Sequence, residues 1–341
     1  MGWPVGHSLS PALHGAAFAA LGLDYAYVPL PVAPDRVADA VRGLRALGFR
    51  GANVTIPHKA AVIPYLDWLE RDAELAEAVN TIVVEDDGTL RGYNTDIVGF
   101  LNALDEVTGA SGGLGATFGG TAPPPAAPQP AAPQPVAPQP AAPQLAAPQL
   151  AGPSARSPQA APAGPALILG AGGAARAAAL ALARRGIPLT IVNRTAARAE
   201  RLRDLISSGV PGSPVTVVPW GGLDKALVRA HALIVNATSL GMAGAVQVPR
   251  GLADNLIAGQ IVVDFVYTGG LTGLLAQAQA QGATIVDGLS VLVWQAAAAF
   301  ELWTGMAAPL EVMCSAVGRQ GALAWPTRNT SASPGERRKG H

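Results

Sequence analysis

The stretch ALILGAGGAARAAALALARRG, residues 166–186, constrains the fold of this 341-residue chain more than any other. A short apolar strand runs directly into a glycine turn and then into a helix. Gly170, Gly172 and Ala175 match the pattern GxGxxG/A, in which the glycines permit a tight turn and close approach of a pyrophosphate. The following helix N-terminus offers free N–H groups to phosphates. We therefore expect a bound dinucleotide, rather than a glycine turn without a ligand.

The segment after the second strand, LTIVNRTAAR, indicates which dinucleotide is bound. An NAD site places an Asp or Glu there for the ribose 2′-hydroxyl. This chain instead has Asn193, Arg194, Thr195 and Arg198. Two guanidinium groups without a carboxylate suit a 2′-phosphate, so we predict NADP. The alternative is that both arginines are ordinary surface residues.

Short β-branched runs alternate with helical stretches from residue 166 onward, which predicts βαβ units and a parallel sheet. The expected strands are ALILG, LTIVN, VTVVPW, ALIVNAT, QIVVDFVY and TIVDG. Residues 289–303 are apolar on nearly all sides and predict a buried helix.

The region before residue 109 also mixes strands and helices. We expect helices over 12–22, 35–48 and near 60–77, with Val37, Val41, Leu44 and Leu47 on one face of the second. Strands are expected at 25–32 and 51–56, followed by a pair of strands in NTIVVEDD and TLRGYNTD.

A proline-rich segment separates the two regions. Residues 126–150 are five pentapeptides, AAPQP, AAPQP, VAPQP, AAPQL and AAPQL, and no charge falls between Glu106 and Arg156. Spaced prolines oppose both helix and sheet ladders, which predicts a semi-rigid tether. A ligand for a partner domain is the less favoured interpretation, because no flanking arginines are present.

Bulk properties exclude several classes of function. Lys+Arg and Asp+Glu balance at 23 each, so no basic field exists to bind nucleic acid or a membrane surface. The single cysteine rules out an internal disulfide and suits a reducing compartment. No apolar run is long enough for a membrane span, and no secretion signal is evident. We expect a cytoplasmic protein that needs no metal.

Several polar residues of the first region have bland explanations when each is taken alone. Ser8 and Ser10 in GHSLSP could simply form a helix N-cap turn. Lys59 in NVTIPHK could be a solvated residue after a buried strand, with His58 structural, and Asp96 in GYNTD could be a turn aspartate.

Together, eight motifs occur in the order and approximate spacing of the shikimate dehydrogenase family. They are HSLSP, GANVTIPHK, AVNTI, GYNTD, GAGGAAR, NRTAAR, NATSLGM and DGLSVLVWQAA. The resemblance covers essentially residues 3–317 apart from the tether. It implies an α/β fold, with a substrate domain of mostly parallel sheet, a Rossmann-like NADP domain and a cleft between them.

The resemblance also implies a domain division and an activity. Residues 1–108, completed by 289–317, would form the substrate domain, and 164–288 the NADP domain. Residues 109–163 would be a disordered linker and 318–341 a disordered tail. The implied reaction is the NADPH-dependent reduction of 3-dehydroshikimate to shikimate in aromatic amino acid biosynthesis, by a monomer or homodimer.

Site residues follow by matching the family motifs. Lys59 and Asp96 match the catalytic pair. Ser8 and Ser10, with Tyr267 nearby, would hold the substrate carboxylate. The ring hydroxyls would be bound by Thr55, Asn80 and Gln295. The phosphate loop would be Gly170, Ala171, Gly172, Gly173 and Ala174, and the 2′-phosphate clamp Asn193, Arg194, Thr195 and Arg198. The residues that would line the nicotinamide are Thr238, Met242, Phe265 and Gly288.

Two departures from the family pattern stand out. The family has a strand of about seven residues before the loop that holds Ser8, whereas Met1 here sits on that loop. We expect the native start to lie upstream, and without that strand we expect neighbouring strands to be unpaired. The tether is the second departure, and it falls where the family has a short connection.

Three other functions are considered. The nearest is a quinate/shikimate dehydrogenase that uses NAD or both cofactors. A catalytically weak binding or regulatory paralogue is disfavoured because both Lys59 and Asp96 are present. A different Rossmann enzyme, acting on amino or folate substrates, is disfavoured by the HSLSP and NVTIPHK motifs.

Overall fold

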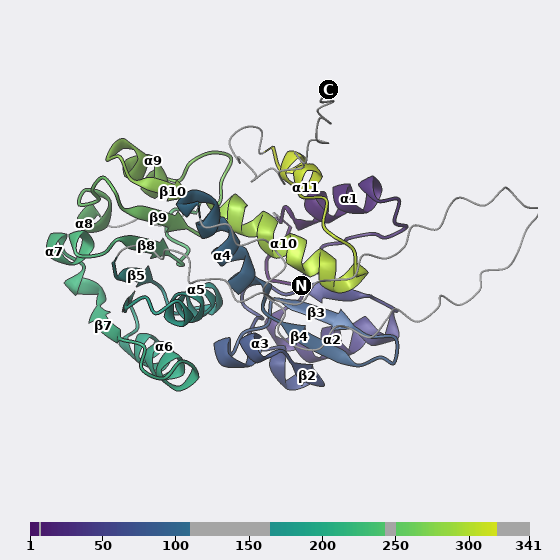
Figure 1. The fold of residues 1–341 in the computed structure, drawn as a ribbon. Helices are drawn as coiled ribbons and strands as arrows, with labels where there is room; N and C mark the ends of the chain where they lie inside the picture. The colour runs from purple at the N-terminus through teal and green to yellow at the C-terminus, as the bar shows by residue number, and fades with distance from the viewer. Residues whose placement is uncertain (7, 110–163, 243–249, 319–341) are drawn as a thin grey trace, which may run out of the picture.

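The computed structural model describes residues 1–6, 8–109, 164–242 and 250–318. Two β-sheets organise these residues into two lobes that lie side by side (Figure 1). The first lobe is the sheet of β1–β4 with helices α1–α4, α10 and α11. The second lobe is the sheet of β5–β10 with helices α5–α9. The expected tether and tail lie outside the described residues, apart from Gly109 and Gly318.

The first sheet has the strand order β1-β3-β4-β2 among its described strands. Their bounds are β1 (Gly51–Asn53), β2 (Trp68–Leu69), β3 (Thr81–Val84) and β4 (Leu90–Tyr93). The pairing of NTIVV with TLRGY is confirmed, because β3 and β4 are antiparallel. The expectation of a mostly parallel sheet is wrong for this lobe, since β1 also pairs antiparallel with β3 and only β2 is parallel to its neighbour β4. The turn between β3 and β4 is too short for a parallel crossover, so the chain reverses direction and these two strands are antiparallel.

The first lobe is covered by helices from both ends of the chain. Their bounds are α1 (Ser10–Ala20), η1 (Pro34–Arg36), α2 (Val37–Ala46), η2 (Ile63–Tyr65), α3 (Arg71–Ala76), α4 (Thr95–Thr108), α10 (Gly288–Thr304) and α11 (Leu310–Ala316). Val37, Val41 and Leu44 of α2 are buried as expected, whereas Leu47 is 75% exposed because the helix ends at Ala46. The expected helices at 12–22, 35–48 and 289–303 are otherwise confirmed.

Two expected elements of the first lobe are wrong. The helix near 60–77 is instead η2, strand β2 and the short helix α3. Pro64 stands inside the proposed helix, where it removes a hydrogen bond and clashes with the preceding turn. The strand at 25–32 forms only one isolated bridge, between Gly2 and Pro31. Leu30 and Val32 make the hydrogen bonds to Gly2, and Pro29 and Pro31 have no N–H to donate to a ladder on the opposite edge.

The second sheet confirms all six expected strands. They are β5 (Ala166–Leu169), β6 (Leu189–Asn193), β7 (Val215–Pro219), β8 (Leu233–Asn236), β9 (Ile261–Asp264) and β10 (Thr284–Val286). All pairings between them are parallel, in the order β10-β9-β8-β5-β6-β7. The order reverses at β5, where the glycine turn begins, and dinucleotides bind at such a switch point.

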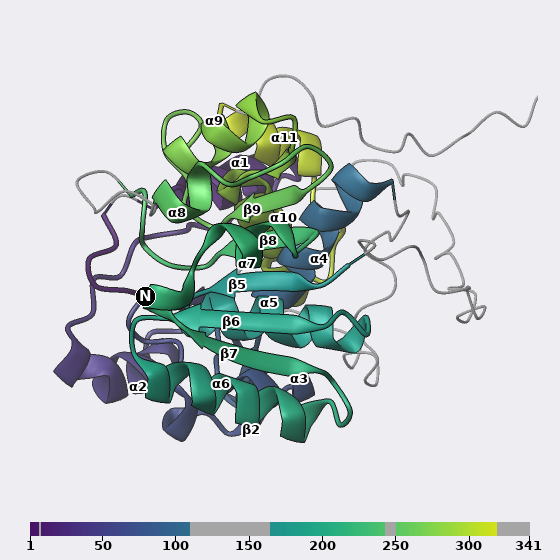
Figure 2. The ribbon, with the colours of Figure 1, turned by 90° about the vertical axis from the view of Figure 1, so that its left-hand side faces the viewer.

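Helices cover both faces of the second sheet (Figure 2). They are α5 (Gly173–Arg184), α6 (Ala196–Gly209), η4 (Trp220–Gly222), α7 (Lys225–Arg229), α8 (Arg250–Ala253) and α9 (Gly273–Ala280). Ala166 and Ile168 of β5 face the cluster that contains α5, whereas Leu167 and Leu169 face the opposite cluster with α9. This alternation follows from the two-residue period of a strand, and burial on both faces explains the continuous apolar runs.

One apolar cluster spans both lobes. Helix α4 packs on α10 and on α5, and Ile97 and Phe100 of α4 belong to the same buried cluster as Ala175 of α5. In Figure 1, α4 and α10 run along the border between the lobes. Among the described residues, no helix is long and apolar enough to cross a membrane.

Candidate active site

The segment after β1 turns sharply and holds Lys59 between the lobes. The His58 N–H donates to the Thr55 carbonyl (2.9 Å), which forms the turn. The His58 ring is buried, and its Nε2 donates to the Val32 carbonyl (2.6 Å), so this histidine anchors the turn. The Lys59 carbonyl accepts from the Val79 N–H (2.8 Å). Anchors on both sides therefore fix the main chain at Lys59.

The structure brings Lys59, Asp96, Asn80 and Gln295 into one cluster. The Lys59 ammonium donates to Oδ2 of Asp96, and their side chains are only 17% and 10% exposed. Asn80 Nδ2 donates to Oδ1 of Asp96 (2.8 Å) and to Oε1 of Gln295 (3.3 Å). The geometry of this ion pair is fixed, because the pair is half-buried and the second carboxylate oxygen of Asp96 also accepts a hydrogen bond.

Asp96 lies in the first turn of α4, where the helix dipole favours a negative charge. Asn94 caps this helix, because its Oδ1 accepts from the Asp96 N–H (3.2 Å). The Asn94 Nδ2 donates to the Ala78 carbonyl (2.8 Å), which ties the cap to the segment that carries Asn80. The sequence NTD thus places the carboxylate through an ordinary helix cap.

A buried hydroxyl and amide network extends from this cluster toward the N-terminal serines. Asn53 Nδ2 donates to Thr81 Oγ1 (3.1 Å), and Tyr27 donates its hydroxyl to Asn53 Oδ1 (2.7 Å). Burial raises the pKa of Tyr27, and a hydrogen bond with the Ser10 side chain opposes that shift. The Ser10 N–H donates to Ser8 Oγ (3.2 Å). The two serines therefore stand at the far end of the same network.

Thr55 and Tyr267 were also predicted to bind the substrate. Within the described residues, neither side chain forms a hydrogen bond to this network. Thr55 is exposed, and its Cγ2 lies so close to Gly2 that a Cβ there would be only 2.4 Å away. Tyr267 is half-buried, and burial raises the pKa of its phenol.

The glycine turn has the shape that a pyrophosphate requires. Gly170 has φ +112°, and a Cβ there would meet the Ala237 carbonyl at 2.8 Å. A Cβ on Gly172, by contrast, would meet nothing within 4 Å, so open space lies beside the N-terminus of α5. No side chain caps that N-terminus, which leaves its N–H groups for a ligand. Ala171 and Ala174 complete the turn, and these residues fit a dinucleotide.

The glycine turn also lies against the candidate catalytic lysine. A Cβ on Gly173 would stand 3.0 Å from Cδ of Lys59 and 3.8 Å from Cβ of Ala78. A side chain at this position would press on the Lys59 side chain, so glycine allows the two lobes to approach this closely. This contact brings the glycine turn next to the Lys59–Asp96 pair.

The residues after β6 that were predicted to bind a 2′-phosphate form an exposed turn. Arg194, Thr195 and Arg198 are exposed, and Asn193 Nδ2 donates to the Thr195 carbonyl (2.9 Å), which shapes the turn. Within the described part of the chain, neither arginine is in an ion pair with a carboxylate. Both guanidinium groups are thus available to an anion.

The four residues predicted to line the nicotinamide follow three neighbouring strands, Thr238 and Met242 after β8, Phe265 after β9 and Gly288 after β10. Thr238 donates its hydroxyl to Asn236 Oδ1 (2.6 Å), and Asn236 Nδ2 donates to Asp264 Oδ1 (2.8 Å). Phe265 stacks on Phe100, and a Cβ on Gly288 would meet the Phe265 carbonyl at 2.7 Å. Met242 is exposed, beside the undescribed residues 243–249. Burial raises the pKa of Asp264, while its three hydrogen-bond donors oppose the shift.

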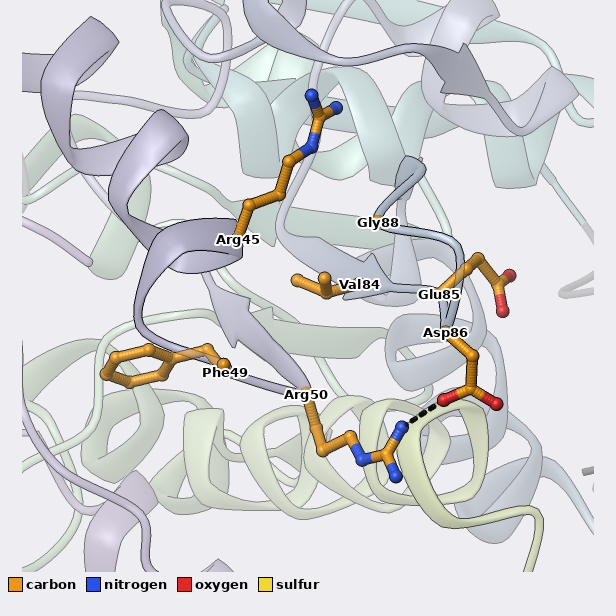
Figure 3. A pocket seen from close by; sticks show the side chains of 8 residues that line it. Arg45, Phe49, Arg50, Val84, Glu85, Asp86 and Gly88 are labelled. Carbon is orange, nitrogen blue, oxygen red and sulfur yellow. Dashed lines mark hydrogen bonds and ion pairs between the residues drawn. The ribbon is translucent and has the colours of Figure 1, made fainter. Parts of the chain in front are cut away.

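A separate pocket of about 220 Å³ lies elsewhere in the first lobe, between the α2–β1 connection and the β3–β4 turn (Figure 3). Arg45 and Arg50 line it, and each already pairs with a carboxylate, Asp67 and Asp86 respectively. It has no contact with Lys59 and gives no support to a second site. Among the described residues, no group of His, Cys, Asp or Glu side chains could hold a metal ion.

Sequence reasoning missed two hydrogen-bonding residues of the cluster, Thr95 and Thr81. The Thr95 N–H donates to Asn80 Oδ1 (2.7 Å), and its hydroxyl bonds that of Thr81 (3.1 Å). Both lie within recognised motifs, where Thr81 follows Asn80 in AVNTI and Thr95 precedes Asp96 in GYNTD. Their position next to a predicted site residue was the signal that could have identified them.

Comparisons with known proteins agree with this geometry. Residues 1–82 match the shikimate dehydrogenase substrate binding domain, and residues 288–317 match the shikimate 5′-dehydrogenase C-terminal domain. A shikimate dehydrogenase (NADP(+)) of Moorella thermoacetica is 42% identical, covering 92% of this chain and 89% of the relative.

Solved structures have the same fold. The shikimate 5-dehydrogenase of Thermus thermophilus in complex with NADP(H) and shikimate is 32% identical, with a TM-score of 0.69 over 93% of this chain and 97% of that one. A quinate dehydrogenase of Corynebacterium glutamicum in complex with NAD is 26% identical, with a TM-score of 0.71 over 92% and 95%. The Moorella relative, 42% identical over 92% of this chain, shows that the protein belongs to the shikimate dehydrogenase family.

Proposed function

We propose that this protein is an NADP-dependent shikimate dehydrogenase, which catalyses the reversible reduction of 3-dehydroshikimate to shikimate in aromatic amino acid biosynthesis. The observation that carries the proposal is the half-buried Lys59–Asp96 pair. Asn80 donates a hydrogen bond to Asp96, and Gly173 of the glycine turn lies against Lys59. The Moorella and Thermus relatives carry the same activity in their names.

The reaction needs a hydride and a proton at one carbonyl. When bound, NADPH supplies the hydride to the carbonyl carbon. The Lys59 ammonium donates a hydrogen bond to the oxygen as it becomes an alkoxide, stabilises that charge and gives up the proton. Asp96 holds the ammonium in place, and Asn80 fixes the second oxygen of Asp96. Hydride and proton together convert the ketone into the alcohol.

Substrate and cofactor would be held on either side of this pair. Ser8 and Ser10 would bind the carboxylate, since the Ser10 side chain interacts with Tyr27, which hydrogen-bonds Asn53, and the Ser10 N–H donates to Ser8 Oγ. Gln295 would bind a ring hydroxyl, since it contacts Asn80 beside Asp96. The division into a substrate domain and an NADP domain is part of the proposal, as are a cytoplasmic location and a monomeric or dimeric state.

The preference for NADP rests on Arg194 and Arg198, which form no ion pair with a carboxylate of the described residues, and on the lack of an acidic residue at the end of β6. The NAD-dependent quinate dehydrogenase with the same fold makes quinate the competing substrate.

A two-by-two assay tests the proposal, with shikimate or quinate as substrate and NADP or NAD as oxidant, following the absorbance of the reduced nicotinamide. We expect shikimate with NADP to give the highest kcat/KM. The variant Arg194→Gln/Arg198→Gln should lose activity with NADP by about tenfold or more and keep its activity with NAD. Preference for quinate, or an equal effect of the variant on both cofactors, would contradict the assignment.

A further inference from the structure

Glu77 joins the two lobes at the point where the chain enters the active site. It follows α3 directly, and among the described non-glycine residues it alone has a positive φ, +45°. Glycine is the usual residue at such a helix end, because a Cβ is strained in the left-handed region. A glutamate there suggests that its side chain has a task.

That side chain is bound by two arginines of the second lobe. Arg176 lies near the N-terminus of α5. Its Nη1 donates to Oε2 of Glu77 (3.3 Å) and to the carbonyls of Ala76 (3.4 Å) and Glu77 (3.2 Å). Arg201 of α6 donates to the same Oε2 (2.7 Å). Arg176 is 19% exposed and Arg201 67%, so the Arg176 contacts are the better shielded from solvent.

The three residues after Glu77 each hold part of the candidate catalytic machinery. The Ala78 carbonyl accepts from Asn94, which caps the helix of Asp96. The Val79 N–H donates to the Lys59 carbonyl. Asn80 donates to Asp96. A displacement of Glu77 would therefore be transmitted to both members of the ion pair.

We propose that Glu77 is a positioning residue for the hydride transfer assigned above, on which this inference rests. Through Arg176 and Arg201 it locks the lobe that carries the glycine turn to the segment 77–80. That lock sets the distance between Lys59 and the Gly173 turn, and so between the proton donor and the cofactor.

The chain supplies a matched control. Helix α3 packs on α5 in the opposite direction, and Asp72 at its other end pairs with Arg184 at the end of α5. Asp72→Asn thus removes an ion pair from the same two helices without touching segment 77–80. Glu77→Gly removes the side chain from a position whose φ suits glycine, so we expect this variant to fold. Glu77→Gln keeps the size of the side chain and removes its charge.

Steady-state kinetics with shikimate and NADP should separate these variants. For Glu77→Gly we expect kcat to fall by about tenfold or more, while KM for shikimate stays within about twofold, because misplaced reacting groups slow the chemical step. Glu77→Gln should fall in between, and Asp72→Asn should keep its kcat. Adding Arg201→Gln to Glu77→Gly should cause little further loss, since Arg201 donates to the Glu77 carboxylate that the first change already removes. A wild-type kcat in Glu77→Gly, or an equal loss in Asp72→Asn, would overturn the proposal.

Hydrogen exchange tests the lock without reference to turnover. The Val79 amide should exchange several-fold faster in Glu77→Gly than in the wild type and remain protected in Asp72→Asn. Unchanged protection in Glu77→Gly would overturn the lock. If the wild-type chain failed to oxidise shikimate while the exchange behaved as expected, the proposed function would fail and the lock would stand.

Discussion

Lys59 is held at three points, which together define its position. Its carbonyl accepts from Val79, its ammonium donates to Asp96, and its Cδ lies against Gly173. A long, flexible side chain loses considerable rotamer entropy when it is fixed in this way. Three contacts on one lysine are therefore more than a solvated surface residue would have, and they favour a role in chemistry.

Replacing this lysine gives the sharpest prediction at the residue scale. Lys59→Ala removes the proton donor, so we expect kcat to fall by about 10²–10⁴-fold with a much smaller change in KM. The substitution also leaves the Asp96 charge half-buried without its partner, which lowers stability. The double variant Lys59→Ala/Asp96→Asn should recover stability in thermal melts but not turnover. Near-normal turnover of Lys59→Ala would rule out the mechanism.

Glu70, just before α3, predicts a pH dependence of stability. Burial, and then the nearby Asp72 charge, raise its pKa from 4.5 to about 7. The folded protein therefore binds this proton more tightly than the unfolded chain does. Its contribution to stability is complete below pH 4.5 and is lost as the pH rises through about 7.

Glu70→Gln removes that dependence. We expect the variant to gain about 3 kcal/mol in the free energy of unfolding relative to the wild type at a pH of about 8, and about 1 kcal/mol or less at a pH of about 5. Thermal melts at the two pH values measure the difference. A gain of the same size at both would show that Glu70 does not titrate in this range.

At the scale of elements, sequence periodicity predicted the second lobe well and the first lobe only in part. Strands β5, β6, β8 and β9 are buried on both faces, so their apolar runs are unbroken and easily recognised. Residues 60–77 misled because the apolar residues around Pro64 have helical spacing, while the proline forces the chain into short turns. Residues 25–32 have strand composition, but their prolines cannot complete a ladder.

The site shows the same limit. The motifs named Lys59 and Asp96 through the family resemblance, yet their contact spans 37 positions and depends on how β1, β3 and α4 are arranged. The interaction of Glu77 with Arg176 spans 99 positions and crosses both lobes. No local pattern encodes such a contact, because periodicity describes which face is buried and not what it faces. Thr95 is a different case, because it stands next to Asp96, which the motif had already identified, and was nevertheless overlooked.

The whole molecule is two lobes joined by packing rather than by the chain alone. The apolar cluster continues from α5 into α4 and α10, and ion pairs from Arg176, Arg184 and Arg185 cross the same border. The direct connection runs from the end of α4, at Thr108, to the start of β5, at Ala166. The interface therefore holds the lobes together, and we expect the long connection to have little influence on how the lobes are arranged.

Removing the five pentapeptides, residues 126–150, tests this view. The cost of closing a loop grows only logarithmically with its length, so shortening it by about half changes that cost by only about 0.6 kcal/mol. We expect kcat and KM for shikimate and NADP to stay within about threefold of the wild type, because the residues placed at the site are all held by contacts within the lobes. A Gly/Ser segment of the same length in place of 126–150 is the control. A loss of about tenfold or more in both variants would give the proline-rich sequence itself a role in catalysis, whereas a loss in the deletion alone would mean that its length, by keeping α4 and β5 unstrained, is what the enzyme needs.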